Sequence, residues 1–123
     1  MTTIKLKRVY EDYSEDDGLR VLVDRLWPRG VKKEELHYDI WAKDITPSNE
    51  LRKWVHMDTQ NRWDEFAIRY QQELSEEKHI TPFIEKIKGY PVITLLYAAK
   101  DQLQNHALIL KGVLEKELQR AHI

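Results

Sequence analysis

The chain has 123 residues, the length of one compact domain. Hydrophobic residues make up 41% of it and charged residues 33%, so it can bury a core and is not broadly disordered. A net charge of -1 provides no overall attraction for a polyanion, which makes nucleic acid an unfavoured partner. The lack of cysteine excludes disulfides, thiolate nucleophiles and cysteine zinc sites.

The beginning of the chain gives no sign of a secretion signal, because Lys5, Lys7 and Arg8 interrupt its apolar residues. The longest apolar run, residues 92–99, is far shorter than the roughly 20 residues that a membrane-crossing helix needs. We therefore expect a cytoplasmic protein without a membrane partner.

Three strands are expected in the first part of the chain. Residues 3–9 alternate apolar and polar side chains, which predicts a strand with one wetter face, and the acidic segment after it predicts an exposed loop. The apolar run at residues 21–23 predicts a buried strand that ends in a turn at residues 24–30. Residues 32–36 predict a short helix, and residues 37–45 favour a third strand.

Three helices are expected in the middle of the chain. Thr46, followed by proline, predicts the cap of a first helix that carries Leu51 and Val55. Residues 61–76 repeat apolar side chains at helical spacing and predict a second helix. The third begins at the next Thr-Pro pair, residues 81–82, and ends near Gly89.

The last part of the chain predicts one more strand and one more helix. Residues 92–97 form the most continuous apolar stretch and suit a central parallel strand. Asp101 and Gln104 fit a capping box, which predicts a final helix that runs to about residue 120.

Strands separated by helices favour a layered α/β fold. We expect a small, mostly parallel, Rossmann-like sheet of about four strands, flanked by helices, in a single domain over residues 1–123. In such sheets ligands bind beyond the carboxyl ends of the strands, which directs attention to the polar segments that follow the second and fourth strands.

The first of these segments is residues 24–30, Asp-Arg-Leu-Trp-Pro-Arg-Gly. The guanidinium groups of Arg25 and Arg29 suit a carboxylate or phosphate, and Trp27 offers a stacking face for a planar ligand. The structural alternative is equally good: Asp24 pairs internally with one arginine, and Trp27 only closes the edge of the sheet.

The second segment runs from Tyr97 at the end of a strand to the start of the final helix. A helix start favours anions, and Lys100 adds positive charge. If Asp101 caps the helix it occupies the free amides itself, which leaves Lys100, Asn105 and His106 as the ligand groups. The structural alternative is a capped helix with solvated Asn105 and His106.

The two segments meet at one edge if the second and fourth strands are parallel neighbours. His106 is then the candidate proton donor or acceptor, oriented by Asp24 or Asp101, and Lys43 can join from the end of the third strand. The chain carries no HExxH, GxGxxG, P-loop or GxSxG motif, so no metal or cofactor is expected.

The same segments resemble a known bacterial family. The resembling motifs are residues 20–30 with Lys33, residues 41–44 with Pro47 and Ser48, residues 51–54, residues 63–70, and residues 94–101 with residues 105–107. On these motifs the chain resembles the YeaO-like branch of an uncharacterised domain-of-unknown-function family, over about residues 4–118. The resemblance implies a small cytoplasmic α/β protein and supplies no substrate. The chain departs from the usual pattern at Val55 and Thr59, where members often carry an aromatic residue and a proline.

Two hypotheses for the function follow. In the first, the protein has a pocket for a small anionic ligand, phosphorylated or nucleotide-like, and one version of it is a hydrolase or transferase. In the second, the same residues form a non-catalytic ligand-binding or protein-interaction domain. The sequence indicates no particular protein partner, and it does not decide whether the protein is an enzyme.

Overall fold

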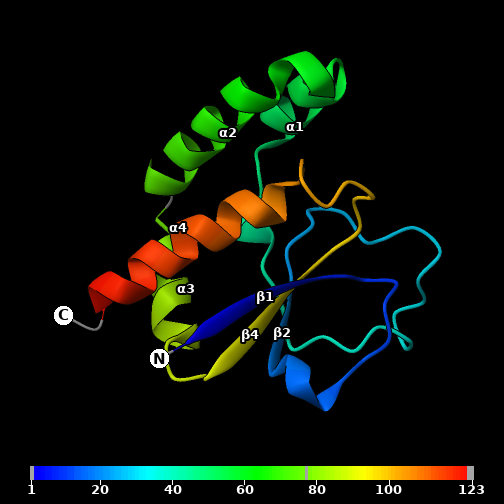
Figure 1. The fold of residues 1–123 in the computed structure, drawn as a ribbon, viewed down its shortest axis with the longest axis vertical. Helices are drawn as coiled ribbons and strands as arrows, with labels where there is room; N and C mark the ends of the chain where they lie inside the picture. Colours follow the sequence, from blue (N-terminus) through cyan, green and yellow to red (C-terminus); the bar gives the residue numbers. More distant parts are fainter. Residues whose placement is uncertain (1, 77, 122–123) are drawn as a thin grey trace.

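The computed structural model describes residues 2–76 and 78–121. It contains a four-stranded parallel sheet in the order β1-β4-β2-β3 and four α-helices. The strands and helices, in chain order, are β1 Thr3–Arg8, β2 Leu19–Leu22, β3 Ile40–Trp41, α1 Asn49–His56, α2 Thr59–Glu76, α3 Ile80–Ile87, β4 Val92–Tyr97 and α4 His106–Ala121 (Figure 1). The layered α/β fold and the central position of β4 confirm the predictions from the sequence.

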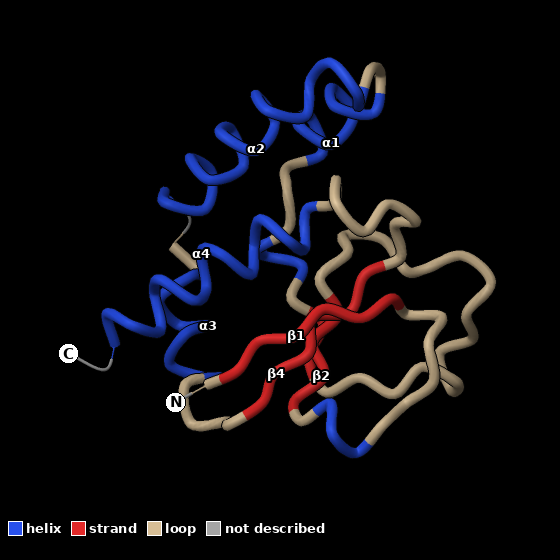
Figure 2. The backbone as a smooth tube through the Cα atoms, in the orientation of Figure 1, coloured by secondary structure: helices blue, strands red, loops and turns tan. Residues whose placement is uncertain are grey.

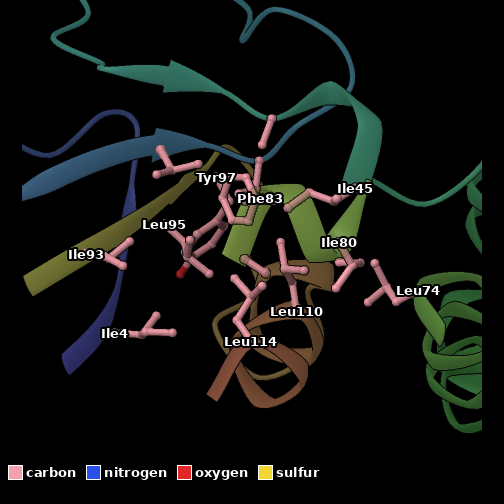
Figure 3. Packing of buried hydrophobic residues seen from close by; sticks show 14 of the residues in the cluster. Ile4, Ile45, Leu74, Ile80, Phe83, Ile93, Leu95, Tyr97, Leu110 and Leu114 are labelled. Atoms are coloured by element: carbon pink, nitrogen blue, oxygen red, sulfur yellow. The ribbon is translucent and has the colours of Figure 1, made fainter. Parts of the chain in front are cut away.

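The helices pack together on one face of the sheet (Figure 2). Ile4, Ile93 and Leu19 are paired in register across β1, β4 and β2, and they point into a core that also holds buried side chains of all four helices. Figure 3 shows Leu110 and Leu114 of α4 among the core residues of the other elements. Burial of a Leu or Ile side chain contributes about 1.5–3 kcal/mol, so this face is the main source of stability.

Loops cover the opposite face. There Leu22 and Leu96 are fully buried beneath a smaller apolar cluster that includes Leu36, Trp27 and Trp41. The two tryptophan rings meet edge to face, with centroids 5.4 Å apart. The long segment between β2 and β3 therefore has a packed core of its own, which holds it against the sheet.

The segment from residue 32 to the start of α1 differs from the prediction. Residues 32–36 form turns and not a helix, and the predicted third strand is reduced to Ile40–Trp41, followed by a 3-10 helix at Lys43–Ile45. The cap of α1 is Ser48, whose hydroxyl accepts a hydrogen bond from Leu51 N, and not Thr46. The Thr46 hydroxyl instead donates to Lys43 O, because Thr46 ends the 3-10 helix.

A buried ion pair lies where β2 begins. Arg20 in β2 has only 2% of its surface exposed and pairs with the carboxylate of Asp17, while its Nε donates to His37 O at 2.5 Å. Lys7 in β1 donates to both carboxylate oxygens of Asp17 at 3.1 Å. Burial alone would raise the pKa of Asp17, but the hydrogen bonds from Lys7, the Ser14 amide and Arg20 outweigh it and hold that pKa below its ordinary value.

Gly18 follows this pair and has a positive φ of +64°. A Cβ at this position would overlap the backbone carbonyl of Val92 in β4. Only glycine therefore allows β2 to begin so close to the start of its neighbour. Across the described residues, no helix combines the length and apolarity needed to span a membrane.

Candidate functional site

A cleft of about 700 Å³ lies beyond the carboxyl ends of β2 and β4. We call it the carboxyl-edge cleft. Its walls come from residues 24–29 after β2, from α1 and α2, and from residues 98–100 and 104–106, which follow β4 and lead into α4. Because β2 and β4 are parallel neighbours, the two polar segments singled out in the sequence do meet at this edge.

A second hollow of similar size, about 690 Å³, lies at the opposite, amino end of the sheet. Glu15, Asp16 and Asp39 line it, with Lys86 as its one cation among the lining residues. It repels rather than attracts anions, and none of the site residues predicted from the sequence lines it. The carboxyl-edge cleft is therefore the candidate site.

Asp24 joins the strand ends that border the cleft. Its Oδ2 accepts a hydrogen bond of 2.9 Å from Ala98 N, which ties the end of β2 to the end of β4. Its backbone carbonyl accepts a 2.7 Å bond from Trp41 Nε1, which ties in β3 as well. This carboxylate is part of the scaffold before any ligand arrives.

His106, the first residue of α4, stands beside this carboxylate. Its Nε2 lies 2.7 Å from Val23 O and 3.2 Å from Asp24 Oδ1. The second distance is short enough for an ion pair, but the atoms are not oriented for a hydrogen bond. Asp24 Oδ1 therefore has no hydrogen-bond partner in the described part of the chain. We give the bond to Val23 O priority, since it is shorter and has hydrogen-bonding geometry. The predicted neighbours His106 and Asp24 are thus in contact, and this contact is an ion pair only when the imidazole is protonated.

The start of α4 differs from the prediction. Asn105, 2% exposed, precedes the helix and accepts a 2.9 Å hydrogen bond from Leu108 N, which is the role expected of Asp101. Asp101 instead accepts bonds from Gln104 N and Leu103 N in a separate turn, and these bonds lower its pKa. Asn105 lines the cleft, but its Nδ2 already donates to Asp101 O. Asp101 itself is not a lining residue.

Four cationic side chains line the carboxyl-edge cleft: Arg25, Arg29, Arg52 and Lys100. Arg25 donates from Nε to Pro47 O at 3.2 Å, and Arg52 makes one long bond of 3.3 Å to Asn49 Oδ1. Within residues 2–76 and 78–121, none of the four pairs with a carboxylate, and Arg52 Nε is buried without a partner. The cleft therefore carries positive charge that the protein does not neutralise.

Trp27 lines the cleft but is strongly held by its neighbours. Its Nε1 donates to Val31 O at 2.6 Å, and its ring meets Tyr38 and Trp41 edge to face. Both predictions for this residue are compatible with its place, since it closes the sheet edge and still contributes to the wall of the cleft.

Two other predicted residues lie outside the cleft. Lys43 places its Nζ 3.8 Å from the centroid of the Trp41 ring. Tyr97 is buried in the main core (Figure 3), where burial first and the charge of Glu11 second raise its pKa. Neither side chain is in a position to meet a ligand in the cleft.

One wall was missed by the sequence reasoning. Arg52, Val55 and His56 line the cleft at the spacing of one face of α1, and Thr59, the first residue of α2, lines it as well. Trp63 and Phe66 in α2 continue this wall. Arg52 also lies in one of the motifs shared with the YeaO-like family, so a signal was present in the sequence. No group of three or more His, Asp or Glu side chains with the arrangement of metal ligands occurs among the residues described.

Comparisons with known proteins decide the family. The family described as the inactive DUF488-N3 subclade matches residues 3–122. The chain belongs to this family. YeaO of Escherichia coli K12, whose printed name calls it uncharacterized, is similar to this DUF488-N3 chain, with 46% identity over 107 residues that make up 87% of the chain and 92% of YeaO.

Mycobacterial relatives of the DUF488-N3 chain extend this comparison. The uncharacterized protein Rv3073c of Mycobacterium tuberculosis H37Rv is 43% identical over 113 residues, which are 92% of this chain and 94% of that protein. The uncharacterized protein Mb3100c of Mycobacterium bovis matches to the same extent. No solved structure matches the chain significantly. The resemblance to the YeaO-like branch is therefore confirmed.

Proposed function

We propose that this member of the DUF488-N3 subclade is a cytoplasmic protein that binds a small phosphorylated or nucleotide-like anion in the carboxyl-edge cleft and does not transform it. One observation carries the proposal: Arg25, Arg29, Arg52 and Lys100, which have no carboxylate partner among the described residues, line a cleft. The one carboxylate among its lining residues is Asp24, which already contacts Ala98 N and His106. Such a concentration of positive charge is unexpected in a chain with a net charge of -1 unless an anion uses it.

The charges favour an oxyanion. Arginine presents a planar set of donors that matches phosphate or carboxylate, and three of the four cations are arginines. A pair of opposite charges about 4 Å apart attracts by about 4 kcal/mol near a protein surface before desolvation is subtracted. Several such pairs are ample for binding a small anion, and they also predict that salt weakens it.

The shape favours a ligand with a planar part. Pockets for small molecules usually enclose about 300–1,000 Å³, and the cleft of about 700 Å³ falls within that range. Val55, Trp63 and Phe66 supply an apolar and aromatic wall opposite the cationic loops. A nucleotide-like ligand combines a flat ring system with a phosphate, which suits both walls.

A hydrolase or transferase is the second candidate function. The contact between His106 and Asp24 favours it, because such a pair is common in general acid–base catalysis. The description of the subclade as inactive weighs against it. Binding without turnover fits that description.

Replacing Arg52 by Gln tests the binding proposal. We expect the dissociation constant for AMP, measured by calorimetric titration, to rise about 10- to 100-fold, because a hydrogen bond to a charged group contributes about 1.5–3 kcal/mol. Wild-type protein is expected to leave AMP intact, as followed by phosphorus NMR. Lys53→Gln is the matched control: it removes the neighbouring charge of α1 from a side chain that does not line the cleft.

Three results would contradict the proposal. The first is wild-type protein that binds neither AMP nor pyrophosphate. The second is equal weakening by Arg52→Gln and Lys53→Gln, which would mean that only the overall charge matters. Conversion of AMP to a product that is lost in His106→Ala would instead establish the enzyme.

A further inference from the structure

The imidazole of His106 is held at one nitrogen and open at the other. Nε2 lies 2.7 Å from Val23 O and 3.2 Å from Asp24 Oδ1, so both of its neighbours are acceptors. Nδ1 has no hydrogen-bond partner among the described residues, and it is not buried. Because the side chain is 19% exposed and lines the cleft, Nδ1 is the ring atom that a ligand can reach.

Two acceptors at one nitrogen determine where the ring carries its hydrogen. Nε2 must hold a hydrogen in the neutral ring, since two oxygens face it and neither can donate. Gain or loss of the second proton therefore takes place at Nδ1. In the neutral ring Nδ1 is an acceptor and repels an oxyanion, whereas in the charged ring it is a donor.

We infer that His106 binds the ligand's oxyanion as an imidazolium, through Nδ1–H, so that binding takes up one proton from solvent. The inference rests on the function proposed above and assigns His106 to binding and not to catalysis. The balance is simple: a neutral ring, a solvent proton and a free anion become a charged ring hydrogen-bonded to the anion. No covalent bond to the ligand forms or breaks.

The charges around the ring explain why the ligand and the proton bind together. Asp24 stabilises the charged ring from the Nε2 side. The cations of the cleft destabilise the charged ring by repulsion. The Tyr70 ring, with its centroid 6.4 Å from that of His106, is neutral, and its hydroxyl donates a hydrogen bond to Ile45 O. A bound anion offsets that repulsion. The other titratable or charged side chains that line the cleft are Tyr10, Arg25, Arg29, Arg52, His56 and Lys100.

The test measures binding against pH with a ligand whose own charge does not change. Adenosine 5′-sulfate is such a probe, because its sulfate ester stays fully ionised where histidine titrates. For wild-type protein we expect the dissociation constant to rise about ten-fold between about pH 5.5 and about pH 8, since histidine loses its charge in that range. Calorimetry in two buffers of different ionisation enthalpy is expected to detect uptake of up to one proton.

Three variants assign the proton. His106→Gln is expected to abolish the pH dependence and the uptake, and to bind at every pH with the weak affinity of wild type at high pH. His56→Gln removes the other histidine that lines the cleft, so it tests whether that ring carries the pH dependence. Its affinity can change, but we expect the ratio of the dissociation constants at high and low pH to stay that of wild type. In Asp24→Asn the acidic partner of the ring is lost, so the pH at which affinity falls is expected to move lower, an effect that a purely structural role would not produce.

The outcomes separate this inference from the proposed function. If wild-type protein binds the probe equally at all pH values, or if the pH dependence disappears in His56→Gln instead, the role of His106 is refuted and the binding cleft stands. If the probe, AMP and pyrophosphate all fail to bind, both proposals fall. The pH profile is compared within each variant, so a loss of folded protein that is the same at every pH does not change the shape of the profile.

Discussion

Replacing Asp17 by Ala is expected to lower the free energy of unfolding by about 3–5 kcal/mol, because it leaves a buried cation without its partner. Arg20 is 2% exposed and pairs with Asp17, and no other carboxylate in the described chain forms an ion pair with it. The variant also removes the acceptor for Lys7. Urea denaturation followed by circular dichroism measures the difference.

A surface pair provides the control for this change. Glu65→Ala removes a carboxylate that pairs with Arg69, but both side chains are about half exposed, so we expect a loss within about 0.5 kcal/mol. The pH dependence gives a second check. Because folding lowers the pKa of Asp17, its contribution is present above the ordinary value of 3.8 and is lost as the pH falls through the lower value of the folded state. The difference between wild type and Asp17→Ala should therefore shrink in acid; a difference that is small at neutral pH would refute the account.

Gly18→Ala is expected to destabilise the protein by about 3–4 kcal/mol. The added Cβ would overlap the backbone carbonyl of Val92, which a side-chain movement cannot relieve. In addition, the φ of +64° is one that alanine adopts only with strain. The start of β2 would have to move away from β4, which disturbs the central pairing of the sheet.

The matched control is a glycine where a methyl group helps. Gly112 lies within α4, and an added Cβ would meet no atom within 4 Å. Since glycine weakens a helix interior, Gly112→Ala is expected to stabilise by about 0.5–1 kcal/mol. Thermal melts of the two variants should therefore shift in opposite directions. Similar melting temperatures for Gly18→Ala and wild type would mean that the two strands separate there without loss.

The elements that the sequence predicted well are those with a strong repeating pattern. Residues 92–97 are apolar apart from Thr94, and the structure places them as the central strand β4. Helical spacing at Phe66, Tyr70 and Leu74 predicted α2, and these three side chains are its buried ones. In both cases the pattern reflects burial in one continuous core, so a local signal and the tertiary structure agree.

The prediction was wrong where tertiary packing decides a short segment. Residues 37–45 alternate like a strand, but only Ile40 and Trp41 pair with β2. The Trp41 side chain packs against the smaller apolar cluster on the face of the sheet that the loops cover. At the start of α4, Asp101 and Asn105 are both suitable caps. The helix begins after Asn105 because its side chain is buried and bonded at both ends. Choice between two local caps depends on what surrounds them.

The meeting of the two polar segments was predicted on the condition that the second and fourth strands are parallel neighbours, and the strand order meets this condition. Arg25, Arg29, Lys100 and His106 all line the cleft as expected. Arg52 could not be placed by the same reasoning, since its position depends on how α1 and α2 fold back over the sheet edge. A helix face that combines one arginine with apolar neighbours gives no sign of what it faces.

The hydrogen bonds at the end of β4 affect the entropy that the proposed binding would cost. Arg8 in β1 donates to the carbonyls of Ala98 and Ala99 at 2.9 Å, and Asp24 holds the Ala98 amide from the other side. The backbone just before Lys100 is thus held by the protein itself, so binding of the proposed anion would not have to order it. Beyond the loss of translational and rotational freedom that any association costs, the entropic penalty on the protein would lie in its side chains, at about 0.5–1.5 kcal/mol for each one that becomes ordered. The proposed binding would therefore gain affinity from a backbone that is already rigid.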